Sequence, residues 1–325
     1  MTKFLYKYMP LRKEFFDNFM IRATPVMALN DPFEGFFNER QVEDADHQQR
    51  EYYRSLGKDV FEKHDGMVED LMGTIQADFF DLGILSFTED HNNPLMWAHY
   101  ANDHKGVVVE FNLNEPLFDD SLQYQDGRRN RFGKCYLGDV FEFPEKVSYR
   151  RQLPSFDRPE LSAPDSENQY HWIKFNREIL FTKSEDWIYE KEHRSVVQLH
   201  DADSIICPEN EHIRKICSYD KSIKVETLGN GKIQVIYPRE YEMHEEMGDE
   251  SIKKEVYRES MDYGEPAIHL FRLNPNSISR IYFGCKSDYF DIAKSISEDD
   301  KLRKLDGLYK MEHSKKYYHL DSKKI

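Results

Sequence analysis

The sequence predicts an α+β fold in which a mixed, largely antiparallel sheet forms the core and helices are inserted between its strands. Short apolar segments alternate with helical ones over the first hundred residues, and strand-like segments dominate the second half. The run Leu228–Lys232, whose centre is Gly-Asn-Gly, is typical of a β-hairpin turn. With 22 Phe, 20 Tyr and 3 Trp among 325 residues, the chain can fill a sizeable core, so we expect one domain over residues 1–325.

The first part of the chain predicts four strands with helices between them. Pro10 is expected to open a helix after the first strand, and residues 42–80 have the apolar spacing of two more helices. Another helix, of about two turns, is expected over Pro94–Ala101, with Pro in its first turn and Asn92 or Asn93 as its cap. The strands are expected at residues 4–8, 21–24, 83–88 and 107–111.

The second part predicts further strands and two helices. Residues 240–262 hold nine acidic and three basic residues, which is typical of a solvated helix or a mobile insertion. The helices are expected at residues 171–182 and 287–297. The strands are expected at residues 133–139, 145–150, 194–199, 223–228, 232–237, 267–273 and 279–283.

Composition excludes several classes of protein. The chain has 45 Lys and Arg against 60 Asp and Glu, and its formal charge of −15 argues against a broad nucleic-acid-binding surface. No apolar run is long enough for a membrane span, and the first residues contain no apolar signal core. The four cysteines are scattered without a CxxC pair, so reduced, buried thiols are expected. We therefore expect a soluble, cytoplasmic protein without a membrane partner.

The first candidate site is the run Asn30–Glu34. Its Asp31 and Glu34 could present two carboxylates from one loop. The Asn-Asp-Pro sequence is also typical of a turn, with Phe33 inserted into the core, and we favour that structural interpretation.

The second candidate site combines the strand end Ser86–Thr88 with the helix that follows it. Ser86 and His99 could form a nucleophile pair, but no GxSxG elbow surrounds the serine. A histidine that caps or orients a loop is the favoured interpretation.

The third candidate site contains Glu190 and Glu192. In an extended segment these residues share a face, opposite Lys191. Paired carboxylates can bind sugar hydroxyls or stabilise an oxocarbenium ion. The alternative is a surface ladder of alternating charges in which Lys191 and Arg194 pair with neighbours, and the segment taken alone favours it.

Metal sites and phosphate-binding loops are not indicated. The 13 histidines include no HxxxH or HExxH spacing with a supporting third ligand, so no metal is expected. The sequence has neither GxxxxGK[ST] nor GxGxxG, which argues against kinase-like and dehydrogenase-like proteins.

Several of these motifs resemble, in order along the chain, those of a bacterial family, the domain-of-unknown-function 2971 group. The resemblance extends over roughly residues 4–285, and the Trp-Ala-His-Tyr-Ala run from Trp97 is specific. The motifs are Leu5-Tyr6-Lys7-Tyr8, Leu29-Asn30-Asp31-Pro32-Phe33-Glu34, Ile84-Leu85-Ser86-Phe87-Thr88-Glu89, Leu95–Ala101 with His104-Lys105-Gly106, and Trp187 with Glu190, Glu192 and Arg194.

The layout of this family is similar to that of small ADP-ribosyltransferases of the toxin and defence type. The resemblance therefore implies an ADP-ribosyltransferase-like fold and NAD as a substrate. One departure is Met9, at a position where relatives commonly carry arginine, so a cation for the NAD diphosphate would come from Lys7, Arg12 or Arg22. The implied catalytic residues are Glu190, Glu192 and Ser86, and the implied nucleotide-binding residues are Lys7, Tyr8, Asn30, Asp31, Thr88, Trp97, His99 and Tyr100.

The leading hypothesis is an ADP-ribosyltransferase-like enzyme or NAD-glycohydrolase, a toxin or anti-phage effector that acts on a small nucleotide without a metal. Its acceptor would be water, a protein or a nucleic acid. Such an enzyme should gather Tyr8, Ser86 and one of the two glutamates around one cleft. One alternative is a non-enzymatic nucleotide- or protein-binding module of a defence system, with both glutamates facing solvent. Another is a hydrolase or nuclease that uses His99 or His104 with Asp31, Glu34 or Glu89.

Overall fold

The computed structural model describes most of the chain, and the structural statements below concern those residues. They are residues 3–55, 57, 79–118, 144–155, 174–238, 250–261, 267–302 and 304–325. The expected strand at 133–139, the first residues of the expected helix at 171–182 and most of the expected second helix within 42–80 lie outside them.

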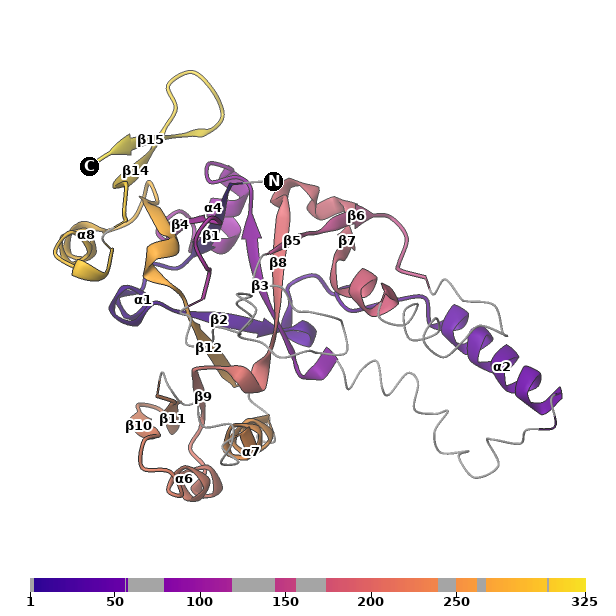
Figure 1. Cartoon of the computed structure of the whole chain (residues 1–325). Helices are drawn as coiled ribbons and strands as arrows, with labels where there is room; N and C mark the ends of the chain where they lie inside the picture. The colour runs from indigo at the N-terminus through magenta and orange to yellow at the C-terminus, as the bar shows by residue number, and fades with distance from the viewer. Residues whose placement is uncertain are drawn as a thin grey trace.

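One large sheet runs through the molecule (Figure 1). In the described part it has 13 strands in the order β10-β11-β9-β12-β2-β3-β1-β4-β13-β14-β15, with β8 paired to β3 and β5 paired to β8. Within it β13 and β14 are parallel, and the other described pairs are antiparallel. The predicted mixed, largely antiparallel sheet is therefore confirmed.

A second, two-stranded sheet pairs β6 with β7. The strands are β1 (Phe4–Met9), β2 (Met20–Pro25), β3 (Leu82–Thr88), β4 (Val107–Asn112), β5 (Glu145–Lys146), β6 (Ser148–Arg150), β7 (Thr182–Ser184), β8 (Glu192–Gln198), β9 (Ser204–Pro208), β10 (Lys224–Leu228), β11 (Lys232–Ile236), β12 (Ile268–Arg272), β13 (Ile278–Phe283), β14 (Gly307–His313) and β15 (Leu320–Lys324).

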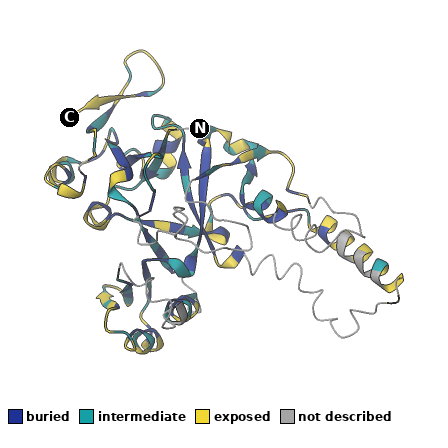
Figure 2. Cartoon of the chain, in the orientation of Figure 1, coloured by how far each residue is buried: buried dark blue, intermediate teal, exposed yellow. Residues whose placement is uncertain are grey.

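Helices surround the sheet, and Figure 2 shows that they turn exposed faces outward while the central strands are buried. Helix α4 lies beside β1, and α6 and α7 lie at the end of the sheet that carries β9, β10 and β11 (Figure 1). The α-helices are α1 (Lys13–Asn18), α2 (Glu39–Ser55), α4 (Pro94–Tyr100), α6 (Glu211–Cys217), α7 (Glu250–Met261) and α8 (Phe290–Ser297), and residues 174–180 are also helical. The short 3-10 turns are η1 (Val26–Ala28), η2 (Glu185–Glu190), η3 (Leu199–Asp201), η5 (Pro275–Ser277) and η6 (Asp300–Leu302).

Some elements differ from the sequence-based expectation. The expected strand at 145–150 is two strands, β5 and β6, which belong to different sheets. The first helix begins at Lys13 rather than at Pro10. In the acidic segment, residues 250–261 form α7, whose Val256 and Tyr257 are buried, so this part packs against the core and is not solvated on all sides. The expected hairpin is present as β10–β11, and its turn has positive φ at Asn230 and Gly231.

Helix α4 is fixed beside β1 by its cap and by the tight turn that follows it. The Asn93 side chain accepts a hydrogen bond from the Leu95 backbone N–H at 3.0 Å, so the expected cap is confirmed. The turn brings Gly106 against β1, where a Cβ would lie 2.3 Å from the Met9 carbonyl oxygen. Only glycine fits at that distance, and it therefore holds α4 close to the end of β1.

Candidate functional site

A pocket of about 170 Å³ opens where β1, β3 and the start of β8 meet α4. The loop after β2 and the short turn η2 complete its wall. Eight of the eleven residues implied as catalytic or nucleotide-binding line this pocket, although they come from five separate parts of the chain. They are Lys7, Tyr8, Asn30, Ser86, Thr88, Tyr100, Glu190 and Glu192.

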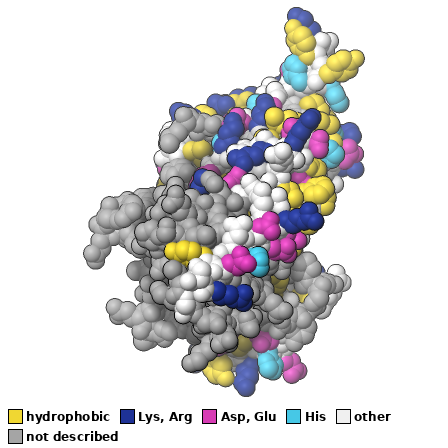
Figure 3. Space-filling model, turned by 90° about the vertical axis from the view of Figure 1, so that its right-hand side faces the viewer, with side chains coloured by type: hydrophobic (Ala, Val, Ile, Leu, Met, Phe, Trp, Pro, Cys, Tyr) yellow, Lys and Arg dark blue, Asp and Glu magenta, His cyan; other side chains and the backbone are white. Residues whose placement is uncertain are grey.

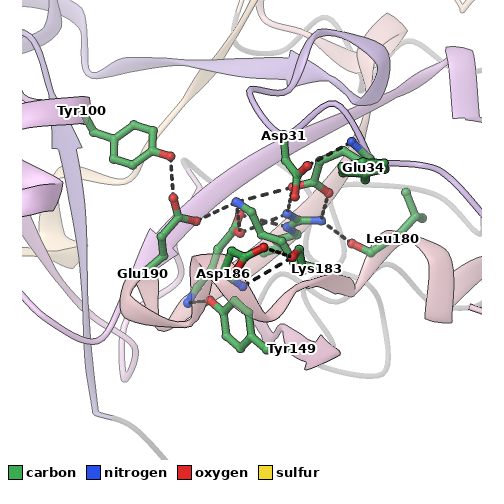
Figure 4. A network of polar contacts seen from close by, with 12 residues as sticks. Asp31, Glu34, Tyr100, Tyr149, Leu180, Lys183, Asp186 and Glu190 are labelled. Atoms are coloured by element: carbon green, nitrogen blue, oxygen red, sulfur yellow. Dashed lines mark hydrogen bonds and ion pairs between the residues drawn. The ribbon is translucent and has the colours of Figure 1, made fainter. Parts of the chain in front are cut away.

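A buried ion-pair cluster of five residues lies against the pocket (Figure 4). Arg194 donates from both terminal nitrogens to Glu34, at 2.8 and 2.5 Å, and from Nε and Nη2 to Glu192, at 2.9 and 3.0 Å. Lys183 Nζ lies 2.6 Å from Glu190, 3.2 Å from Glu192 and 3.5 Å from Glu34. All five side chains are at most 7% exposed. We call Glu34, Lys183, Glu190, Glu192 and Arg194 the ion-pair cluster.

The two glutamates of the 190s are held differently. Glu190 accepts one hydrogen bond on each oxygen, from the Tyr100 hydroxyl at 2.5 Å and from Lys183. Glu192 accepts from Arg194 on both oxygens and from Lys183 on one of them, and its backbone N–H donates to the Tyr149 hydroxyl at 2.7 Å. A carboxylate has about four lone-pair sites, so Glu190 keeps more capacity for a bound ligand.

The charges around the pocket are set by burial and by these pairings. Burial alone would raise the pKa of Glu192, but Arg194 and Lys183, with a hydrogen bond from the Ser86 side chain, lower it to about 2. At Lys7 burial dominates and lowers the pKa of the ammonium to about 8, against the opposing effect of Glu192 and Glu190. Glu192 is therefore ionised near neutral pH, while Lys7 titrates just above it.

Tyr100 stays protonated beside the carboxylate that it contacts. Burial raises the pKa of its hydroxyl above the usual range, and the hydrogen bond to Glu190 raises it further. The hydroxyl is therefore a fixed donor to Glu190 at any pH near neutral.

The backbone that presents these glutamates is not the extended segment expected from the sequence. Glu190 ends the 3-10 turn η2, Lys191 has a left-handed φ of 46°, and β8 begins at Glu192. The sharp change of direction still brings both carboxylates to Lys183. The surface ladder is wrong for Arg194, which is buried, whereas the exposed Lys191 does pair with Asp90, at 3.2 Å.

The Asn30–Glu34 run forms a turn and also supplies Glu34 to the ion-pair cluster. Asp31 does not line the pocket: its Oδ1 accepts from the Phe33 backbone N–H at 3.0 Å, which is the expected turn chemistry. Phe33 is 59% exposed, so its expected insertion into the core is wrong. Glu34 instead turns inward to Arg194.

Trp97 and His99 also lie outside the pocket lining. Trp97 is fully buried behind the pocket, where its ring packs edge-on against Tyr8 with centroids 5.3 Å apart and its Nε1–H donates to the His91 carbonyl oxygen. His99 is exposed on the outer side of α4. Neither residue touches a ligand in the pocket directly, although Trp97 supports Tyr8.

The three cations considered for a diphosphate are separated by the fold. Lys7 lines the pocket and donates from Nζ to the Ser86 carbonyl oxygen at 2.8 Å. Arg12 and Arg22 are exposed and do not line it. Lys7 is therefore the cation of the three that a ligand in the pocket would meet.

Comparison with known proteins bears on the middle of the chain. Residues 96–195 match a family model described as a protein of unknown function, DUF2971. This match supports the resemblance to that family over a shorter stretch than the motifs suggest. No curated protein and no solved structure matches the chain.

The DUF2971 segment contains most of the ion-pair cluster. Tyr100, Lys183, Glu190, Glu192 and Arg194 all lie within residues 96–195. The pocket residues of β1, β3 and the loop after β2 lie before that segment.

Lys183 and Arg194 were not expected as site residues. Nothing in the sequence around Lys183 distinguishes it from a surface lysine. Arg194 did carry a signal, because it begins the expected strand at 194–199, two residues before the apolar pair Val196-Val197, and a charge that is buried with such residues needs a partner. Within the described residues no group of three or more His, Cys, Asp or Glu could hold a metal ion, and no helix is long and apolar enough to cross a membrane.

Proposed function

We propose that the pocket binds NAD by its nicotinamide–ribose end and cleaves the bond between them, as an ADP-ribosyltransferase or NAD-glycohydrolase. The observation that carries this proposal is the meeting of Tyr8, Ser86 and two buried glutamates in one pocket. The pocket thereby combines carboxylates, a hydroxyl, aromatic rings and a cation, which are the groups that this reaction uses.

The reaction breaks the bond from the ribose C1′ to the nicotinamide nitrogen, and the electron pair leaves with nicotinamide. Positive charge then develops on the ribose, and the fixed negative charge of Glu192 stabilises it. Glu190, with lone pairs to spare, accepts a hydrogen bond from a ribose hydroxyl or from the attacking acceptor. The acceptor oxygen bonds to C1′, and its proton passes to solvent water.

The size of the pocket indicates which part of the dinucleotide it takes. Pockets that enclose a drug-sized ligand measure about 300–1,000 Å³. A cavity of about 170 Å³ suits one ring with its sugar, beside the rings of Tyr8 and Tyr100. The diphosphate then lies toward Lys7, and the adenosine lies outside the cavity.

The test is nicotinamide release from NAD by the purified chain, with an extract as a source of acceptor. Glu190→Gln and Glu192→Gln should each lower the rate by about 10²-fold or more. Glu185→Gln is the matched control, because Glu185 lies in the same turn η2 but does not line the pocket, and its rate should equal that of wild type. Full activity in both Glu190→Gln and Glu192→Gln rejects the proposal.

A role as a toxin or defence effector can be tested separately, in bacterial cells. Expression of an active chain in bacteria should deplete NAD and arrest growth, and Glu190→Gln should relieve both effects. Unchanged NAD in cells that accumulate the wild-type chain argues against an NAD-consuming effector.

A second candidate function is nucleotide binding without turnover. It is favoured by the pairing within the cluster, since each oxygen of Glu190 and Glu192 already accepts a hydrogen bond from within the protein. NAD binding by the wild type without nicotinamide release, with or without extract, would select this function.

The pH dependence of NAD affinity tests the role of Lys7. Lys7 has a pKa of about 8, so it is cationic below that pH and attracts the diphosphate, and it loses its charge as the pH rises. NAD affinity should therefore fall between about pH 7 and pH 9. Lys7→Arg keeps its charge throughout and should remove this dependence. An identical pH profile in wild type and Lys7→Arg would contradict the assignment.

A further inference from the structure

An arm made of the last two strands projects from the body of the molecule (Figure 1). The arm comprises residues 307–325, in which β14 and β15 pair antiparallel and β15 forms one edge of the large sheet. The opposite edge is β10. The four residues of β15 after Leu320, and Ile325 after them, are exposed, so the arm offers an open surface.

The arm differs in charge from the rest of the chain. It has five lysines against two acidic residues, a net charge of +3 with histidines neutral, in a chain whose formal charge is −15. Lys315 and Lys316 lie at its tip and are exposed. Figure 3 shows lysine, hydrophobic and histidine side chains together on the projection at the top of the molecule. The arm is thus a local cationic surface on an acidic protein.

Aromatic rings occupy the same tip. Tyr318 is fully exposed and Tyr317 is 58% exposed. Tyr317 stacks on His319 with ring centroids 5.5 Å apart and planes 18° apart, and Lys316 Nζ lies 5.1 Å from the Tyr317 centroid. This stacking holds the Tyr317 ring in place, so it forms a flat platform beside a cation.

The base of the arm packs into the apolar cluster that lies behind the pocket. Met311 and Leu320 are buried in the same apolar cluster as Tyr8 and Met96, and both of the latter line the pocket. A ligand on the arm is therefore anchored on the structure that shapes the pocket.

We propose that the arm binds single-stranded nucleic acid, with bases stacked on Tyr317 and Tyr318 and phosphates paired with Lys315 and Lys316. Aromatic platforms interleaved with cations bind single strands in this way, because an unpaired base offers its ring face. A duplex hides those faces, and the acidic body repels its long phosphate rows. The binding itself does not depend on NAD cleavage. That the bound strand receives ADP-ribose rests on the proposed function.

The experiment measures fluorescence anisotropy of a labelled oligothymidylate of about 20 nucleotides, longer than the roughly 4–16 nucleotides that a single-strand-binding module covers. The assay contains no NAD, so the measured binding does not depend on whether the protein cleaves NAD. The arm variants are Tyr317→Ala/Tyr318→Ala and Lys315→Glu/Lys316→Glu. The matched controls lie near the opposite edge of the sheet, where Tyr219 is 71% exposed and Lys221 and Lys224 are exposed: Tyr219→Ala and Lys221→Glu/Lys224→Glu.

Wild type and both controls should bind equally, and each arm variant should bind about tenfold more weakly or worse. Affinity should also fall as salt is raised, with a shallower slope in Lys315→Glu/Lys316→Glu. Three results overturn the proposal: no binding by wild type at low salt, equal binding by the arm variants, and arm-dependent binding to anionic phospholipid vesicles without binding to the oligonucleotide.

Discussion

Replacing Arg194 with leucine should lower the free energy of unfolding by about 3–5 kcal/mol. The arginine is 1% exposed and joins Glu34 to Glu192, so its loss leaves two buried carboxylates with Lys183 as their remaining cation. Urea unfolding at neutral pH measures the change.

Arg177→Leu is the matched control for that variant. Arg177 pairs with Glu145, but the two side chains are 32% and 39% exposed, so the expected loss is about 0–1 kcal/mol. Equal losses in the two variants would contradict the view that the ion-pair cluster supports the fold.

Acid should weaken the same cluster. The pKa of Glu192 is about 2 in the folded chain, compared with an ordinary value of 4.5. A carboxyl group whose pKa is lowered by folding stabilises the folded state above its unfolded pKa. That contribution is complete above about pH 4.5 and is lost as the pH falls toward 2.

Trp97→Ala should also cost about 3–5 kcal/mol. The indole is fully buried, packs against Tyr8 and donates a hydrogen bond to the His91 carbonyl oxygen. Removing it leaves a cavity and an unpaired carbonyl group. Thermal or urea unfolding of the variant measures the loss of stability. Ligand binding in the pocket should weaken as well, because Tyr8 loses its support.

Phe33→Ala tests whether the loss of stability depends on the burial of an aromatic side chain rather than on its being aromatic. Phe33 is 59% exposed, so its replacement should change stability by no more than about 0.5 kcal/mol. A loss as large as that of Trp97→Ala would show that the exposed position of Phe33 is incorrect.

The sheet could be predicted because its strands carry strong local signals. The apolar runs of β1, β3 and β4 match the expected strands to within two residues, and Asn93 caps α4 as its position before Pro94 predicts. Elements without such a pattern were missed. β15 is almost wholly exposed, so its sequence has no alternation of buried and exposed residues.

The composition of the pocket could be predicted only in part. Ser86 and Thr88 could be expected at a site because they end a predicted strand, but the sequence does not show that β3 pairs antiparallel with β8, which places Thr88 opposite Glu192. The role of Lys183 could not be foreseen, since its three partners lie in two distant parts of the chain and only the tertiary fold brings Glu34 to the other two.

Local backbone conformation explains the remaining errors around the pocket. The left-handed residue Lys191 turns the chain between Glu190 and Glu192, and the strand rule for alternate residues does not apply across such a turn. Phe33 is exposed because the turn at Asp31 directs Glu34, three residues after Asp31, toward the buried Arg194. The ion pair between Glu34 and Arg194 therefore determines which side of that loop faces inward.

Under the proposed function the ion-pair cluster serves both stability and activity, so the two have to be measured separately. Glu190→Gln keeps an amide oxygen for Tyr100 and leaves Lys183 with Glu34 and Glu192, and it should fold normally. Glu192→Gln weakens the buried pair with Arg194 and should lower stability as well as activity. Glu190→Gln is therefore the better variant for trapping a substrate.

The central claim is that the pocket takes the nicotinamide–ribose end of NAD. The most direct measurement is a crystal structure of Glu190→Gln with NAD, since this variant should bind the substrate without cleaving it. We expect the nicotinamide ring beside Tyr8 and Tyr100, the ribose next to residues 190 and 192, and the diphosphate near Lys7. NAD bound at another place, or an empty pocket at saturating NAD, would contradict it.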